Sequence, residues 1–267
     1  MTPRRAMAVS SAVYALFIAL HLSIAQDAGA VVRGIVPGIG GWLGPAGWAI
    51  YAVVAAAAVA LVGIAATGLT RAPAPGSWRL TTGPIVAGLP FLLLGVNIAP
   101  GDVLPLLVVG VPLVALNEEL FYRGVLLPLL RPLGWRRAIV WSSIAFGASH
   151  LANLASGAYP PFVAMQVAAT TAGGVALAAI RIRSGSLWPV LATHAVLDVV
   201  AVSTLTGPGT SSPILVPVLL AWLGANLCLW RYGMRLVSGL SDEELDLQFE
   251  NGARPRWARA AHISVRT

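Results

Sequence analysis

Long apolar stretches alternate with short polar segments along the whole chain. A helix that crosses a lipid bilayer needs about 20 mostly apolar residues, and eight stretches come close to or exceed that length. They cover residues 8–25, 46–69, 82–100, 103–122, 138–154, 160–180, 186–205 and 213–234. The pattern therefore predicts an all-α, polytopic membrane bundle of about eight transmembrane helices.

The composition supports a membrane protein and excludes two other classes. Of the 267 residues, 57% are hydrophobic and 10% are charged, whereas soluble proteins carry about 25% charged residues. So few charges cannot cover a water-facing surface, which excludes a soluble enzyme. The high apolar content equally excludes a disordered chain. The single cysteine, Cys228, cannot form an internal disulfide.

The basic residues predict the topology. All 17 are arginines, and the net charge is +7, but they lie in short groups between apolar stretches and not on one face. We therefore expect no nucleic-acid partner. Alternate loops are rich in arginine, which by the positive-inside rule predicts a multi-pass protein of the cell membrane with both termini cytoplasmic. The string Ala28-Gly29-Ala30 also resembles a signal-peptide cleavage site, and cleavage there would leave seven spans.

The chain divides near residue 237 into a transmembrane helical domain, 1–237, and a cytoplasmic polar tail, 238–267. In the tail, Ser241 and Glu244 have the spacing of a capping box. This spacing predicts a short helix over residues 242–249.

Six ionisable side chains lie in or at the edge of predicted spans, where charge is costly. They are Glu118, Glu119, Arg123, His150, His194 and Asp198. A charge at the bilayer centre costs ~2.5–3.5 kcal/mol on insertion scales. These side chains must therefore face one another or a water-filled cavity, and we expect them to converge on a polar pocket.

Helical spacing predicts which of these side chains share a face. Glu119 and Arg123 are four residues apart and can pair, whereas Glu118 is rotated by about 100° from Glu119 and is expected to point elsewhere. His194 and Asp198 are also four residues apart, so they share a face of their span.

The three helices carry groups that suit peptide hydrolysis. A carboxylate and a histidine can jointly hold and deprotonate a water, and a second histidine with a polar neighbour can stabilise an oxyanion. Alternatively, Glu118, His150 and His194 could bind zinc, as two-His-one-Glu catalytic sites do. The zinc-peptidase string H-E-x-x-H and the nucleophile string G-x-S-x-G are both absent from the sequence.

These residues resemble the three motifs of the CPBP family of intramembrane endopeptidases, which is also called the CAAX prenyl protease-like or abortive-infection, lysostaphin-resistance-like family. The motifs occur in the family's order, and the motif core covers about residues 110–200. E-E-x-x-x-R is matched by Glu118, Glu119 and Arg123, F-x-x-x-H by Phe146 and His150 with Asn153 in the frequent H-x-x-N extension, and H-x-x-x-N or D by His194 and Asp198.

The resemblance implies that residues 1–237 form an all-helical membrane protease. In such an enzyme, Glu118 and His150 would activate the attacking water. His194 and Asp198 would stabilise the tetrahedral intermediate.

The remaining motif residues would support these four. Glu119 and Arg123 would set the geometry of the first motif, and Phe146 would be a packing residue that shapes the site. For Asn153 two roles stay open: it either caps the end of its helix or lines the pocket.

No cofactor is favoured, with zinc as the alternative. Asp198 stands where the members that process prenylated proteins carry Asn. An ionised Asp accepts hydrogen bonds but cannot donate them, so it would orient His194 and hold it protonated, or ligate a metal.

Three classes of function stay open from the sequence. The first is an endopeptidase acting in the lipid bilayer on a membrane-embedded or membrane-proximal peptide or protein. The second is a non-catalytic membrane immunity or regulatory partner with the same fold. The third, a transporter or proton relay, should show repeated halves, and the sequence shows no such repeat. Eukaryotic relatives remove a C-terminal tripeptide from prenylated CAAX proteins, but the sequence does not name the substrate.

Overall fold

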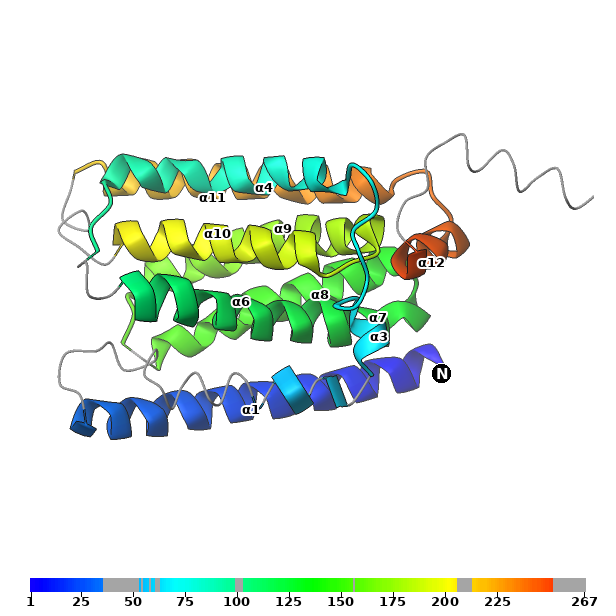
Figure 1. Ribbon diagram of the computed structural model, residues 1–267, viewed down its shortest axis with the longest axis horizontal. Coiled ribbons are helices and arrows are strands. Elements are labelled where there is room, and N and C mark those ends of the chain that lie inside the picture. Colours follow the sequence, from blue (N-terminus) through cyan, green and yellow to red (C-terminus); the bar gives the residue numbers. More distant parts are fainter. Residues whose placement is uncertain are drawn as a thin grey trace, which may run out of the picture.

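The computed structural model of the protein describes residues 1–35, 53, 55–57, 59–60, 63–98, 103–155, 157–205 and 213–251. Within these ranges the chain is helical and contains no strand. The long helices lie alongside one another in a bundle (Figure 1). The all-α fold class is therefore confirmed.

The described part of the chain consists of consecutive helical elements. In chain order they are α1 (Pro3–Ile35), α3 (Ile64–Thr67), η1 (Ser77–Thr81), α4 (Thr82–Gly88), η2 (Leu89–Leu94), η3 (Val103–Gly110), α6 (Val111–Glu119), η4 (Leu120–Leu126), α7 (Leu127–Leu130), η5 (Arg131–Leu133), α8 (Trp135–Ser149), η6 (His150–Leu154), α9 (Pro160–Ser184), α10 (Trp188–Leu205), α11 (Leu215–Val237) and α12 (Asp242–Asn251). Of these, η3 and η4 are π-helical, and the other η elements are 3-10 helices.

Three of the described helices, α9, α10 and α11, are long and apolar enough to cross a membrane. They correspond to the last three predicted spans. The predicted span 46–69 lies largely outside the described residues. The predicted spans 103–122 and 138–154 consist of consecutive shorter helices, and in the predicted span 82–100 two short helices end at Leu94. The count of about eight spans is therefore not confirmed and stays a prediction.

Prolines explain part of this segmentation. Pro90, Pro112 and Pro128 each lie in the first turn of η2, α6 and α7, respectively. A proline has no backbone N–H to donate and clashes with the preceding turn. The chain adjusts through 3-10 and π segments, so one apolar stretch is divided into several elements.

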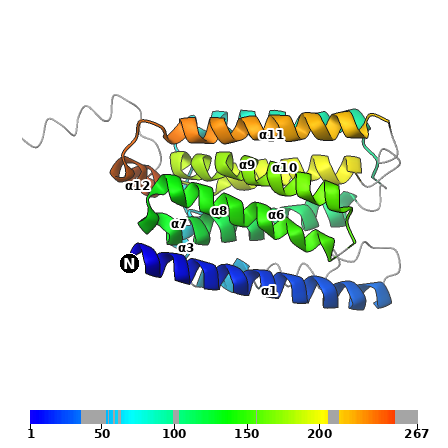
Figure 2. The same ribbon diagram turned by 180° about the vertical axis from the view of Figure 1, so that it is seen from behind.

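The N-terminus and α12 lie at the same end of the bundle in both views (Figures 1 and 2). Two arginines lie at this end of the bundle, since Arg71 and Arg131 both contact α12. Helix α1 continues without a break through residues 28–30. Which end of the bundle faces the cytoplasm stays a prediction, as does the division of the chain at residue 237.

The predicted capping box and the short helix that follows it are confirmed. The backbone N–H of Ser241 donates to Glu244 Oε2 over 2.9 Å, and the backbone N–H of Glu244 donates to Ser241 Oγ over 3.2 Å. Helix α12 packs Leu245 and Phe249 into the main hydrophobic core. At its C-terminal end, Arg71 donates to the carbonyl oxygen of Phe249 over 2.8 Å.

Helix α9 lies at the centre of the bundle and is approached closely by both neighbours. A Cβ atom added at Gly147 of α8 would overlap Thr171 and the carbonyl oxygen of Val167. One added at Gly233 of α11 would lie 2.7 Å from the carbonyl oxygen of Val175. Glycine therefore lets both helices rest directly on the backbone of α9, as small residues do in membrane bundles.

Candidate active site

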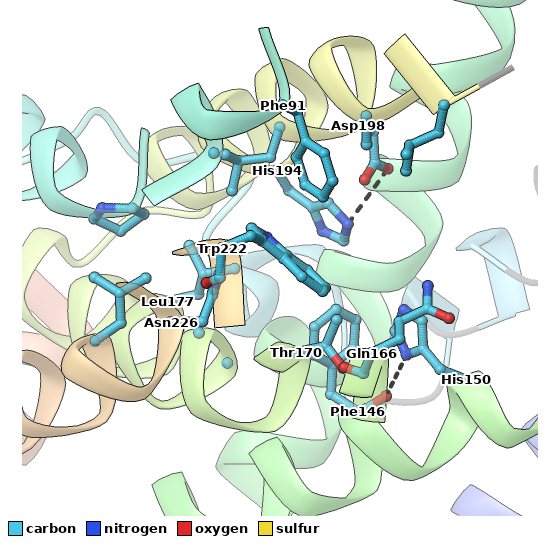
Figure 3. A pocket seen from close by; sticks show the side chains of 18 of the residues that line it. Phe91, Phe146, His150, Gln166, Thr170, Leu177, His194, Asp198, Trp222 and Asn226 are labelled. Atoms are coloured by element: carbon cyan, nitrogen blue, oxygen red, sulfur yellow. Dashed lines mark hydrogen bonds and ion pairs between the residues drawn. The ribbon is translucent and has the colours of Figure 1, made fainter. Parts of the chain in front are cut away.

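The motif residues come from separate elements and meet inside the bundle. The end of α6 carries Glu118 and Glu119, η4 carries Arg123, α8 carries Phe146, η6 begins with His150, and α10 carries His194 and Asp198. The close-up of the larger cavity shows Phe146, His150, His194 and Asp198 turned toward the same space (Figure 3). The predicted convergence of these spans is thus present in the fold.

The predicted pair of Glu119 and Arg123 is confirmed. Arg123 Nη1 donates to Glu119 Oε1 over 2.9 Å, and both side chains are buried. The guanidinium also lies 4.3 Å from the centroid of the Phe146 ring and donates to the carbonyl oxygen of Gly174 over 3.4 Å. A buried ion pair needs such additional partners to offset its desolvation.

His194 lies among three carboxylates. Its Nδ1 is 2.7 Å from Glu119 Oε1. Its Nε2 is 3.4 Å from Asp198 Oδ2 and 3.6 Å from Glu118 Oε2. The predicted shared face of His194 and Asp198 is therefore confirmed.

The expectation that Glu118 points away from Glu119 is corrected. The two side chains leave α6 about 100° apart, yet both reach the imidazole of His194, one at each ring nitrogen. The reason is geometric, because a ring on a neighbouring helix can enter the angle between two consecutive long side chains. Glu119 therefore joins the first motif to the third as well as pairing with Arg123.

Phe146 separates and positions the two histidines. Its ring meets the ring of His150 edge-on at a centroid distance of 5.2 Å and that of His194 at 5.7 Å. His150 Nδ1 lies 3.1 Å from the carbonyl oxygen of Phe146. A carbonyl oxygen can only accept, so Nδ1 carries the proton and Nε2 is the basic nitrogen of a neutral His150.

Two cavities adjoin at His150. The smaller, about 40 Å³, is lined by Phe17, Glu118, Tyr122, Ser149, His150 and Asn153. One water needs about 10–15 Å³ of this kind of volume, so the smaller cavity has room for at least one. Asn153 lines this cavity and donates through Nδ2 to Gln166 Oε1 over 2.9 Å. Of its two predicted roles, the structure thus has Asn153 lining the pocket.

The larger cavity, about 140 Å³, runs between α4, η2, α9, α10 and α11. His150, His194 and Asp198 line it beside aromatic residues such as Phe91 and Trp222. Polar groups that the sequence reasoning missed also line it: Gln166, Thr170 and Asn226. A signal for them existed, because a polar side chain in an apolar span commonly faces a cavity or a partner helix.

The alternative zinc set does not form a ready site. Among the residues that the structure describes, no group of three or more His, Cys, Asp or Glu residues is arranged to hold a metal ion. This includes Glu118, His150 and His194.

Comparison with known proteins identifies the part of the chain that holds the site. Residues 100–200 match the family described as Type II CAAX prenyl endopeptidase Rce1-like. The match spans all three motifs and the predicted motif core, so the resemblance is confirmed over this region. No curated protein and no solved structure gave a significant match. Residues 100–200 are thus similar to a CAAX protease-type family, and the apolar helices α9, α10 and α11 fit a membrane protein.

Proposed function

We propose that the protein is an intramembrane endopeptidase that hydrolyses a peptide bond of a membrane-embedded or membrane-proximal peptide or protein. One observation carries this proposal, namely the position of His150. It lines a small polar cavity together with Glu118 and a larger, mainly apolar cavity together with His194 and Asp198. A water held in the first cavity would therefore lie beside a peptide held in the second.

The water is activated by Glu118 and His150. Glu118 makes no hydrogen bond to a described residue, and its nearest ionic contact is His194 at 3.6 Å, so its carboxylate is available to a water. His150 offers Nε2 as a second acceptor, because Nδ1 donates to the carbonyl oxygen of Phe146. A carboxylate and an imidazole that share one water can remove its proton as it attacks.

The tetrahedral intermediate is stabilised by His194 and Asp198. A His194 that carries both protons places positive charge beside the larger cavity, where the oxyanion develops. Asp198 Oδ2 and Glu119 Oε1 hold the two ring nitrogens in place. Arg123 in turn holds Glu119, so Glu119 and Arg123 are positioning residues.

The proton balance closes within the site. The attacking water forms the new C–O bond and gives one proton to Glu118 or His150. When the C–N bond breaks, that proton passes to the leaving amine. The products are a carboxylic acid and a free amine, and no redox partner is needed.

The larger cavity also bears on the substrate. None of the described residues that line it is an arginine, so a free C-terminal carboxylate would have no guanidinium to bind there. Together with Asp198 at the last motif position, this favours an internal peptide segment over a C-terminal tripeptide.

The proposal is tested by comparing the membrane proteomes of cells that make the wild-type protein or the Glu118→Gln variant. We expect peptide ends that are present with wild type and absent with Glu118→Gln. Ser142→Ala is the matched control, because the Ser142 hydroxyl donates to the carbonyl oxygen of Ile139 in its own helix and to no other described residue. Identical peptide ends in all three strains would refute the proposal. Metal analysis of the purified, active protein addresses the zinc alternative separately.

A further inference from the structure

The proposed chemistry gains from more than one hydrogen-bond donor to the oxyanion, and the motif residues supply at most one. Both ring nitrogens of His194 already face carboxylates, Nδ1 at 2.7 Å from Glu119 and Nε2 at 3.4 Å from Asp198. Nδ1 forms a hydrogen bond with Glu119 Oε1, whereas Nε2 has only longer ionic contacts, with Asp198 and Glu118. Asp198 itself has no donor when it is ionised. An oxyanion in the larger cavity would therefore meet positive charge and at most one N–H from these groups, that of His194 Nε2.

Gln166 has such a donor. It lies in the second turn of α9 and lines the larger cavity together with His150, His194 and Asp198 (Figure 3). Its Oε1 accepts a hydrogen bond from Asn153 Nδ2 over 2.9 Å. Because the oxygen of the amide is held on that side, its NH2 group points the other way. Gln166 Nε2 makes no hydrogen bond to any residue that the structure describes.

We infer that Gln166 is a catalytic residue that donates a hydrogen bond from Nε2 to the oxyanion of the tetrahedral intermediate, with Asn153 as the positioning residue that sets the direction of the amide. This inference rests on the proposed endopeptidase function. Side-chain amides serve as oxyanion donors in hydrolases, and removing one such donor lowers kcat by roughly 10²–10³-fold. The residue comes from α9, which is held in place by close contacts with α8 and α11, so the donor would be pre-organised.

Two other roles of Gln166, one structural and one in substrate binding, have to be distinguished from oxyanion stabilisation. Gln166 could simply tie η6 to α9 through Asn153, in which case its loss would affect stability and not turnover. It could alternatively bind the substrate backbone equally in the ground state and the transition state, in which case its loss would raise KM and leave kcat unchanged.

The first test compares Gln166→Glu and Gln166→Leu with wild type on the peptide identified by the proteome comparison. Glutamate keeps an acceptor for Asn153 and removes the N–H donor, whereas leucine removes both without adding charge. We expect kcat to fall by about 10²-fold or more in both variants, with KM changed by less than about threefold. Ser142→Ala again serves as the control and should retain wild-type kcat.

A binding measurement separates oxyanion contact from structural damage. The probe is a phosphonate analogue of the same peptide, in which a tetrahedral anionic phosphonate replaces the scissile amide. Gln166→Leu should weaken binding of the phosphonate at least about tenfold more than binding of the uncleaved peptide. Equal weakening of both ligands, or a kcat within about threefold of wild type in Gln166→Glu, would overturn the inference.

The second test leaves Gln166 in place and turns its amide. In Asn153→Asp, the new carboxylate can only accept, so Gln166 must present Nε2 to it and Oε1 to the cavity. We expect kcat to fall as in Gln166→Leu, and the same substitution made in the Gln166→Leu background to have little further effect. Additive losses in the double variant would show that Asn153 acts independently of Gln166 and would contradict its positioning role.

Failure of the inference can be told from failure of the proposed function. If wild type cleaves the peptide and Glu118→Gln does not, the proposed function stands and the Gln166 variants alone decide the inference. If wild type and Glu118→Gln give the same peptide ends, the proposed function is wrong and the inference falls with it.

Discussion

Glu119 Oε1 lies 2.7 Å from His194 Nδ1, so the first and third motifs meet in one hydrogen bond between α6 and α10. The same oxygen accepts from Arg123 at 2.9 Å. The guanidinium, the carboxylate and the imidazole thus form a continuous buried chain. The orientation of the imidazole depends on a residue that does not itself need to touch the substrate.

Replacing Glu119 should therefore lower the free energy of unfolding. Glu119→Ala leaves Arg123 buried without its carboxylate, and breaking a buried pair in this way costs about 3–5 kcal/mol. Glu119→Gln keeps an acceptor oxygen for both partners and should cost less. Thermal unfolding in detergent checks the order, in which wild type is the most stable and the alanine variant the least. Equal melting temperatures for the alanine and glutamine variants would contradict the prediction.

Glu118 should behave in the opposite way. Because it makes no hydrogen bond to a described residue, Glu118→Gln should keep the melting temperature of wild type. Peptide cleavage should fall by about 10²–10⁴-fold, as expected for loss of a general base. A variant that folds normally and retains its cellular effect would favour the non-catalytic immunity or regulatory role over the protease.

Gly174 should not tolerate a side chain. A Cβ atom there would lie 3.2 Å from Arg123 Nη2 and 3.3 Å from Phe146 Cδ1. Gly174→Ala should therefore cost about 1–3 kcal/mol through overpacking and disturb the Phe146 ring between the two histidines. Gly224→Ala is the control, because a Cβ atom there meets nothing within 4 Å. Unfolding measurements should find only the first variant destabilised.

Helix α12 should detach when its buried aromatic anchor is removed. Phe249 packs 4.9 Å from the Trp135 ring and beneath the guanidinium of Arg181 at 4.1 Å. Phe249→Ala should cost about 3–5 kcal/mol and accelerate proteolysis in the segment before α12. Leu247→Ala on the same helix is the control, since Leu247 is 59% exposed. Equal cleavage rates for the two variants would contradict the docking role of Phe249.

Contacts within a helix could be predicted from the sequence, and contacts between helices could not. The pairs of Glu119 with Arg123 and of His194 with Asp198 follow from a spacing of four residues. The contact of Glu119 with His194 depends on how α6 and α10 are rotated about their axes, which no local pattern encodes. For the same reason the sequence reasoning placed Glu118 away from this contact.

The division of some apolar stretches into several short helices also could not be predicted from hydropathy. Length and apolar content predicted α9, α10 and α11 well, because each is one regular helix. They did not predict that the stretch 103–122 begins and ends in π-helical turns. A role for Gln166 could not be predicted from the sequence because this residue matches no motif. The role is inferred from its hydrogen bond to Asn153 on another element.

The glycine contacts that hold α8 and α11 against α9 bear on how substrate preference could change. Gly147 and Gly233 line neither cavity described above, yet each fixes the separation of two helices that do. A methyl group at either position would move a whole wall of the larger cavity. Variants selected for cleavage of new peptides should therefore carry substitutions at Gly147 or Gly233 as well as at residues that line the cavity.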